Sequence, residues 1–78
     1  MPNQDGAGAI ANFEALAEAA YERMYESRNP AADYADVKDF FAAAIGAATR
    51  AGLGDEVARL TERLEQCRAV YRSQFSSF

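Results

Sequence analysis

Apolar residues recur every three or four positions along three stretches of the chain, which is the spacing of one face of an α-helix. We predict helices at residues 12–27, at 30 or 33 to 51, and at 55–74. No alternating apolar and polar run and no hairpin dipeptide indicates a strand. The predicted fold class is therefore all-α. We expect a small three-helix bundle built on an antiparallel helical hairpin of the second and third helices, with the first helix packed across it.

Capping residues set the expected helix ends. Asn12 and Asp55 have side chains that suit the N-cap of the first and third helices. Asn29 precedes Pro30, a pair typical of a helix start, and Gly52 is a typical residue just past a helix end. We predict a single domain over residues 1–78, in which the polar, glycine-bearing residues 1–9 form a flexible leader.

Each predicted helix carries one apolar stripe, and the three stripes are expected to meet in one core. The stripe of the first helix consists of Phe13, Leu16, Ala17, Ala20 and Met24. The stripe of the second consists of Tyr34, Val37, Phe41, Ile45 and Ala48, widened by Phe40 and Ala44. The third is a heptad seam with one polar break, formed by Val57, Leu60, Leu64, Cys67, Tyr71, Gln74 and Phe78.

Length and composition limit the class of protein. The chain has 78 residues, and a domain of this size buries only about 60% of the surface that its unfolded form exposes, so its core is marginal. A hydrophobic fraction of 50% excludes disorder. We expect a cytoplasmic protein, because no apolar run reaches the roughly 20 residues of a membrane span, the first residues lack a signal peptide, and a single cysteine permits no internal disulfide. One lysine against seven arginines, with abundant alanine, indicates a GC-rich bacterial genome.

The charge is acidic and unevenly distributed. A net charge of −4 disfavours binding to nucleic acid, which requires basic residues to displace counterions. Residues 1–57 carry ten acidic against four basic residues, whereas residues 58–78 carry two acidic against four basic residues. We therefore expect the C-terminal segment to pack beside the acidic part, within one chain or between two.

The chain lacks the residues of an enzyme. It has no histidine, which is the commonest general base and metal ligand near neutral pH. It has one cysteine, and no phosphate-binding loop, nucleophile elbow or calcium loop. Cys67 lies on the apolar seam, where a buried structural thiol is expected. We predict no enzymatic activity, no cofactor and no metal ion.

Aromatic and acidic residues supply two candidate binding surfaces. Nine aromatic residues are many for a core of this size, and those left outside it are typical of an interface. The candidate interface consists of Tyr21, Tyr25, Phe40, Tyr71, Phe75 and Phe78; alternatively, these rings cover the ends of the bundle. A candidate acidic docking ridge consists of Glu14, Glu18, Glu22 and Glu26; alternatively, it is an ordinary solvated helix face.

The leading functional interpretation is a protein–protein interaction module, either an adaptor or a small chaperone-like subunit. We expect a homodimer, because the alanine-rich first turns of the second helix would cover Tyr71 and Phe75 poorly and a second copy would cover them with the same patch. The partner is thus this chain itself, an unidentified protein chain, or both, with neither nucleic acid nor membrane. The alternative is an acidic regulatory protein that occupies a basic surface of its partner, as a nucleic-acid mimic or an anti-activator does.

Overall fold

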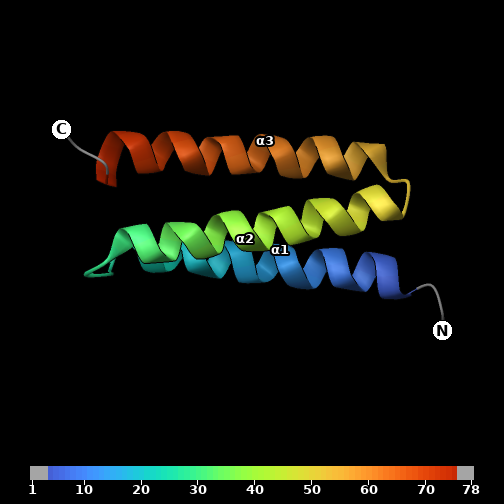
Figure 1. The fold of residues 1–78 in the computed structure, drawn as a ribbon, viewed down its shortest axis with the longest axis horizontal. Helices are drawn as coiled ribbons and strands as arrows, with labels where there is room; N and C mark the ends of the chain where they lie inside the picture. Colours follow the sequence, from blue (N-terminus) through green and yellow to red (C-terminus); the bar gives the residue numbers. More distant parts are fainter. Residues whose placement is uncertain (1–3, 76–78) are drawn as a thin grey trace.

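The computed structural model describes residues 4–75, with the side chains of residues 8–75, and this part of the chain contains three helices and no strand (Figure 1). The helices are α1 (Gln4–Met24), α2 (Pro30–Arg50) and α3 (Gly54–Val70), and α3 continues into a π-helical turn, η1 (Tyr71–Phe75). The predicted all-α fold class is confirmed.

Helix α1 begins well before the predicted N-cap at Asn12, which lies exposed inside the helix. Residues 4–9, which we expected to form a flexible leader, make up its first turns, and residues 1–3 lie outside the described residues. Ile10 is only 5% exposed, because it extends the apolar stripe of α1 backward onto the core. Burial of this side chain offsets the low helix propensity of the two glycines that precede it. The prediction that Leu16 belongs to the buried stripe is wrong, because this residue is 40% exposed.

The turn between α1 and α2 follows the predicted capping chemistry. Helix α1 ends at Met24, before the predicted Ser27. The Ser27 hydroxyl accepts a hydrogen bond of 2.9 Å from the backbone N–H of Asn29. The Asn29 side chain in turn accepts a hydrogen bond of 3.4 Å from the N–H of Ala32, and Pro30 occupies the first helical position. The predicted start of the second helix at Asn29–Pro30 is confirmed.

The connection between α2 and α3 depends on a glycine with left-handed backbone geometry. Gly52 has φ of 73°, and the N–H of Leu53 donates a 3.0 Å hydrogen bond back to the carbonyl of Ala48. This is the Schellman arrangement, for which glycine is the favoured residue. The predicted N-cap at Asp55 is wrong: α3 starts at Gly54 with Leu53 at the N-cap position, and Asp55 lies in the first turn, where its charge favours the helix dipole.

Helix α2 is the helix that packs against both of the others. It runs antiparallel to both neighbours and packs against each, whereas the backbones of α1 and α3 hardly approach one another (Figure 1). The principal extents of the Cα trace are 46, 20 and 12 Å. Its radius of gyration, 13.3 Å, exceeds the roughly 11.5 Å expected for a globular chain of this length. The gap between the backbones of α1 and α3 must therefore be bridged by their side chains.

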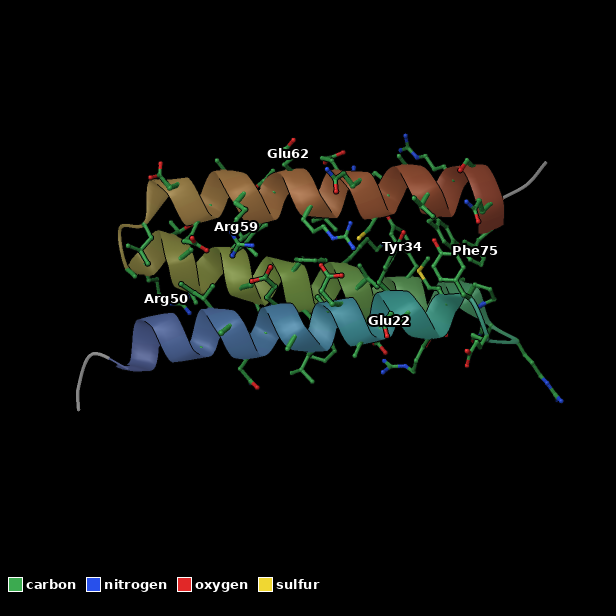
Figure 2. All side chains as sticks on the ribbon, turned by 180° about the vertical axis from the view of Figure 1, so that it is seen from behind. Glu22, Tyr34, Arg50, Arg59, Glu62 and Phe75 are labelled. Atoms are coloured by element: carbon green, nitrogen blue, oxygen red, sulfur yellow. The ribbon has the colours of Figure 1, made fainter. Side chains whose placement is uncertain are left out.

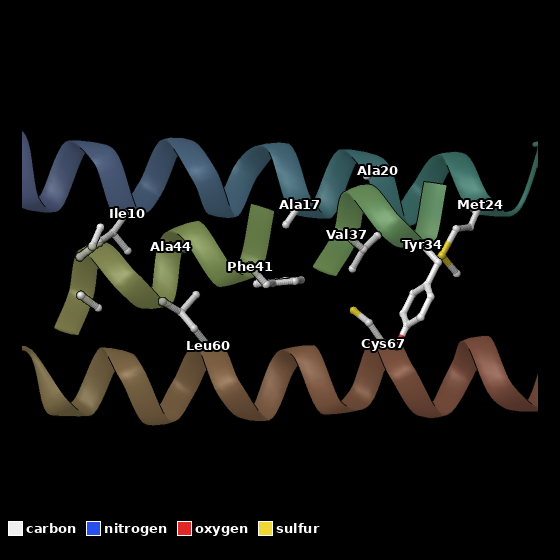
Figure 3. Close-up of a cluster of buried hydrophobic side chains, with 12 residues drawn as sticks. Ile10, Ala17, Ala20, Met24, Tyr34, Val37, Phe41, Ala44, Leu60 and Cys67 are labelled. Carbon is white, nitrogen blue, oxygen red and sulfur yellow. The ribbon is translucent and has the colours of Figure 1, made fainter. Parts of the chain in front are cut away.

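The core lies between the three helices and is entirely apolar (Figure 3). Phe41, Met24, Leu60, Val37 and Cys67 are its largest fully buried side chains. Small buried alanines on α1 and α2, such as Ala17 and Ala44, let these two helices pack closely. In the described part of the chain no polar or charged residue is buried. No helix in that part is both long and apolar enough to cross a membrane.

Candidate functional site

Two glutamates of the acidic ridge bind arginines of α3. The Glu14 carboxylate accepts hydrogen bonds of 2.7 and 3.0 Å from the guanidinium of Arg59, which also donates to Glu56 at 2.6 Å. The Glu18 carboxylate accepts hydrogen bonds of 2.7 and 2.8 Å from Arg63. Figure 2 shows Arg59 reaching from α3 into the space between α3 and α1. The expected packing of the basic C-terminal segment beside the acidic part is confirmed, and it occurs within one chain.

These ion pairs close the third side of the bundle without creating a reactive group. The hydrogen bond from Arg59 holds the pKa of Glu14 below its ordinary value, so this carboxylate stays ionised near neutral pH. The same bond raises the pKa of Arg59. Both partners are therefore fixed in their charged forms, which suits a structural bridge and not a proton donor or acceptor.

The other half of the ridge has no such partners. Glu22 and Glu26 are exposed. Among the ion pairs of residues 8–75, none involves either carboxylate. The predicted ridge is thus two pairs of residues with different surroundings. Glu14 and Glu18 are bound within the chain, and Glu22 and Glu26 face solvent.

Five aromatic rings join all three helices at the end of the bundle where α1 ends and α2 begins. The rings of Tyr34 and Tyr71 stack with centroids 4.1 Å apart and an interplanar angle of 7°. Phe75 lies 6.2 Å from Tyr71 and meets Tyr25 edge to face at 5.3 Å. Tyr21 meets Tyr25 edge to face at 5.6 Å. Figure 2 shows Tyr34 and Phe75 at this end, and we refer to these five residues as the aromatic cluster.

Four of the six residues predicted as an interface belong to the aromatic cluster. Phe40 does not, because it is partly buried against the core from the middle helix. Phe78 lies outside the described residues. The sequence pattern places Tyr34 only in the apolar stripe of the second helix. Its place in the cluster follows from the antiparallel hairpin, since the first turns of α2 lie beside the last turns of α3 and bring Tyr34 to Tyr71.

The premise behind the expected homodimer is wrong in one respect. Tyr71 and Phe75 are both partly buried, because Tyr34 stacks on the first and Tyr25 covers the second. The alanines in the first turns of α2 are exposed and do not have to cover these rings. The alternative explanation for the aromatic residues is that they cover the ends of the bundle. It accounts for most of the residues of the aromatic cluster.

Tyr25 is the most exposed residue of the aromatic cluster. Its residue is 51% exposed, although its position is fixed from two sides. Its hydroxyl lies 3.0 Å from that of Tyr21 in a hydrogen bond, and its ring meets Phe75. The hydrogen bond with Tyr25 raises the pKa of Tyr21 to about 12. The chain therefore presents one aromatic ring to solvent in a held orientation.

Other rings of the cluster carry a cation from the chain itself. The guanidinium of Arg63 lies over the ring of Tyr21, 5.0 Å from its centroid. The amino group of Lys38 lies over the ring of Tyr34, also at 5.0 Å. Both distances fall within the range of about 6 Å for cation–π attraction.

The rest of the described surface was compared with the requirements of a metal site and of a reactive thiol. In residues 8–75 no group of three or more histidine, cysteine or acidic side chains is arranged so that it could hold a metal ion. A hollow between the first turns of α1 and α3 is lined by apolar groups and by Glu14, Glu56 and Arg59, whose charges already satisfy one another. Cys67 is fully buried, and burial raises the pKa of its thiol, so it is not a ready nucleophile. No protein-family model, no curated protein and no solved structure matches this chain.

Proposed function

We propose that the chain is a non-enzymatic protein–protein interaction module, an adaptor or small chaperone-like subunit, that binds its partner through the aromatic end of the bundle. The observation that carries this proposal is Tyr25, a half-exposed ring held in place by Tyr21 and Phe75. Tyrosine is enriched among the residues that dominate binding energy at protein interfaces.

The held ring favours binding for two physical reasons. Apolar surface that a partner removes from water contributes about 25 cal/mol per Å². A side chain that is already ordered in the free protein also loses less conformational entropy on binding, which otherwise costs about 0.5–1.5 kcal/mol for each flexible side chain. The hydroxyl of Tyr25 and its contact with Phe75 supply this order before any partner arrives.

We propose a different protein chain as the principal partner. The expectation of a homodimer rested on exposed rings at Tyr71 and Phe75, and the chain covers much of both with its own residues. What remains is a small patch around Tyr25, which suits a projecting side chain of a partner better than a broad two-fold interface. Sedimentation equilibrium of the pure protein separates the two cases, since a dimer mass that reverts to a monomer with Tyr25→Ala would assign the patch to self-association.

The alternative function, an acidic regulatory protein that occupies a basic surface, has less support. Glu14 and Glu18 already neutralise two arginines of α3, so the continuous acidic face that such a protein needs is halved. Binding through that face alone would be lost at high ionic strength, whereas binding that also buries the ring of Tyr25 would keep part of its affinity.

The proposal is tested by affinity capture from the source cell followed by mass spectrometry, with two single-residue variants. Tyr25→Ala removes the exposed ring, and Leu16→Ala is the matched control, because Leu16 is a comparably exposed apolar residue elsewhere on α1. We expect the same proteins to bind the parent and Leu16→Ala and to be lost with Tyr25→Ala, while the circular dichroism spectra of all three stay alike. Capture that is indifferent to Tyr25→Ala would refute the proposal.

A further inference from the structure

We infer that the partner places a cationic side chain, preferentially arginine, from a basic protein segment over the exposed ring of Tyr25, beside Glu22 and Glu26. This inference rests on the proposed function and specifies the chemistry of the partner. It assigns a role to Glu22 and Glu26, the two glutamates of the ridge that form no ion pair within residues 8–75.

Two other rings of the aromatic cluster already have a cation over them. The rings of Tyr21 and Tyr34 each carry a basic side chain of the chain itself at 5.0 Å. Tyr25 is more exposed than either, and in residues 8–75 no basic group lies over its ring. The exposed ring therefore offers the same kind of site that its two neighbours have filled.

The surface around Tyr25 carries an excess of negative charge. Glu22 precedes Tyr25 by three residues, so the two are neighbours on the helix surface. Glu26 follows Tyr25 in the chain and lines a hollow with Arg23 and Asp33. Arg23, the nearest base along α1, is turned toward α2, where it pairs with Asp33 at 3.5 Å. Arg28 is exposed in the turn and forms no ion pair with either glutamate in the described chain. A local excess of negative charge next to an aromatic ring is complementary to a positive group.

The geometry of the helix explains why these acids are left over. A row of residues at four-residue spacing drifts by about 40° around a helix at each step, because one turn contains about 3.6 residues. The row therefore faces α3 at Glu14 and Glu18, where it meets Arg59 and Arg63, and then winds away from α3. At Glu22 it faces solvent, and Tyr25 takes over the side of α1 that faces α3 and meets Phe75.

Arginine fits this surface better than lysine, and a protein fits it better than a nucleic acid. A guanidinium is planar and can stack on a ring while its N–H groups donate to a carboxylate, whereas an ammonium acts as a compact point charge. A nucleic acid would bring phosphates against Glu22 and Glu26, which repel them. A basic segment of another protein supplies the charge without that repulsion.

The inference is tested by nuclear magnetic resonance titration of the full chain with three defined peptides. All three are blocked at both ends and equal in length, and they carry several arginines, several lysines or several glutamines. We expect the arginine peptide to shift the resonances of residues 21–27 and of η1, to bind more tightly than the lysine peptide, and to weaken as the ionic strength rises from about 0.05 to about 0.3 M. The glutamine peptide should produce no shifts there.

Two variants and a matched control separate a site from a general effect of net charge. Tyr25→Leu keeps an apolar side chain but removes the aromatic face, and should weaken binding of the arginine peptide about two- to fivefold, the range for an exposed cation–π contact. E22Q with E26Q should weaken it by a similar or larger factor. The control variant E62Q with D39N also removes two negative charges and should leave binding nearly unchanged. Glu62 lies on the outer side of α3 (Figure 2), and Asp39 is exposed on α2.

The outcomes distinguish this inference from the proposed function. Equal weakening by the control pair, or equal binding of the glutamine peptide, would overturn the inference. Resonance shifts that appear with protein concentration alone would also overturn it, because they would assign the patch to a second copy. If Tyr25→Ala abolishes capture of a cellular partner while no basic peptide binds, the proposed function stands and the cationic partner is refuted.

Discussion

Truncation of Leu60 is the sharpest test of how the core is built. Leu60 is fully buried on α3 and points toward α2 (Figure 3). Leu60→Ala removes three carbon atoms, worth about 2.4 kcal/mol at roughly 0.8 kcal/mol per buried methylene. A cavity that its neighbours cannot fill raises the total to about 2.5–5 kcal/mol.

The heptad seam alone would give the largest effect to Leu64, which lies at its centre. In the structure Leu64 is only partly buried, whereas Leu60 is fully buried. We therefore expect Leu64→Ala to cost about 1–2 kcal/mol. Leu16→Ala, at a residue that is 40% exposed, should cost less than about 1 kcal/mol.

Urea unfolding followed by far-ultraviolet circular dichroism measures this order. A chain of 78 residues is expected to have a free energy of unfolding of about 4–12 kcal/mol, so Leu60→Ala can fall close to the unfolding threshold. An osmolyte at equal concentration in every sample brings all three variants into the measurable range. A free-energy loss for Leu64→Ala equal to or larger than that for Leu60→Ala would refute the packing described above.

Three further predictions follow from local features. Gly52→Ala should lower the free energy of unfolding by about 1–2 kcal/mol because φ is 73°, whereas Gly54→Ala, whose Cβ meets no atom within 4 Å, should be neutral or stabilising; equal melting temperatures would contradict this. Because the folded pKa of Glu14 is lowered, its contribution to stability is present above about pH 4.5 and is lost as the pH falls through the folded value; a Glu14→Gln variant with the same acid sensitivity would refute the ion pair. The pKa of Tyr21, raised to about 12, makes its contribution to stability disappear as the pH rises from about 10 toward 12; in an ultraviolet titration Tyr25→Phe should lower this pKa, and an unchanged value would rule out the hydrogen bond.

A helix start can be predicted from the sequence where it depends only on neighbouring residues. The start of α2 needed only Asn29 and Pro30, whose effects act within one turn. The start of α1 depends instead on a contact between distant residues. Ile10 belongs to the helix because it packs on the core, and the glycine-bearing segment before it resembles a leader until that contact is known. At α3 the N-cap residue, Leu53, makes no side-chain cap hydrogen bond, so a pattern of capping side chains indicates Asp55 instead.

The sequence predicts which residues make up each candidate surface. It does not predict which of them are bound within the chain and which face solvent. Spacing along one helix shows which residues share a ridge, and the partners of that ridge depend on where a second helix lies. A usable signal was present, because Glu14 and Glu18 are separated by four residues, as are Arg59 and Arg63. In an up-down-up bundle α1 and α3 run parallel, so two rows with equal spacing can pair in register, each over a separation of 45 residues.

The division of the ridge also indicates which contacts hold α3 in place. The side chains in the ion pairs of Arg59 with Glu14 and of Arg63 with Glu18 are 25–50% exposed, and pairs at the surface contribute about 0–1 kcal/mol each. The backbones of α1 and α3 hardly meet, so these pairs cannot bear the whole attachment. The stack of Tyr34 on Tyr71 and the contact of Tyr25 with Phe75 add apolar burial at the other end, where aromatic pairs contribute about 0.5–1.5 kcal/mol beyond their area. A partner bound at Tyr25 would therefore act on the contacts that fix the end of α3, and binding there would stabilise the third helix of the bundle as well as occupy the exposed ring.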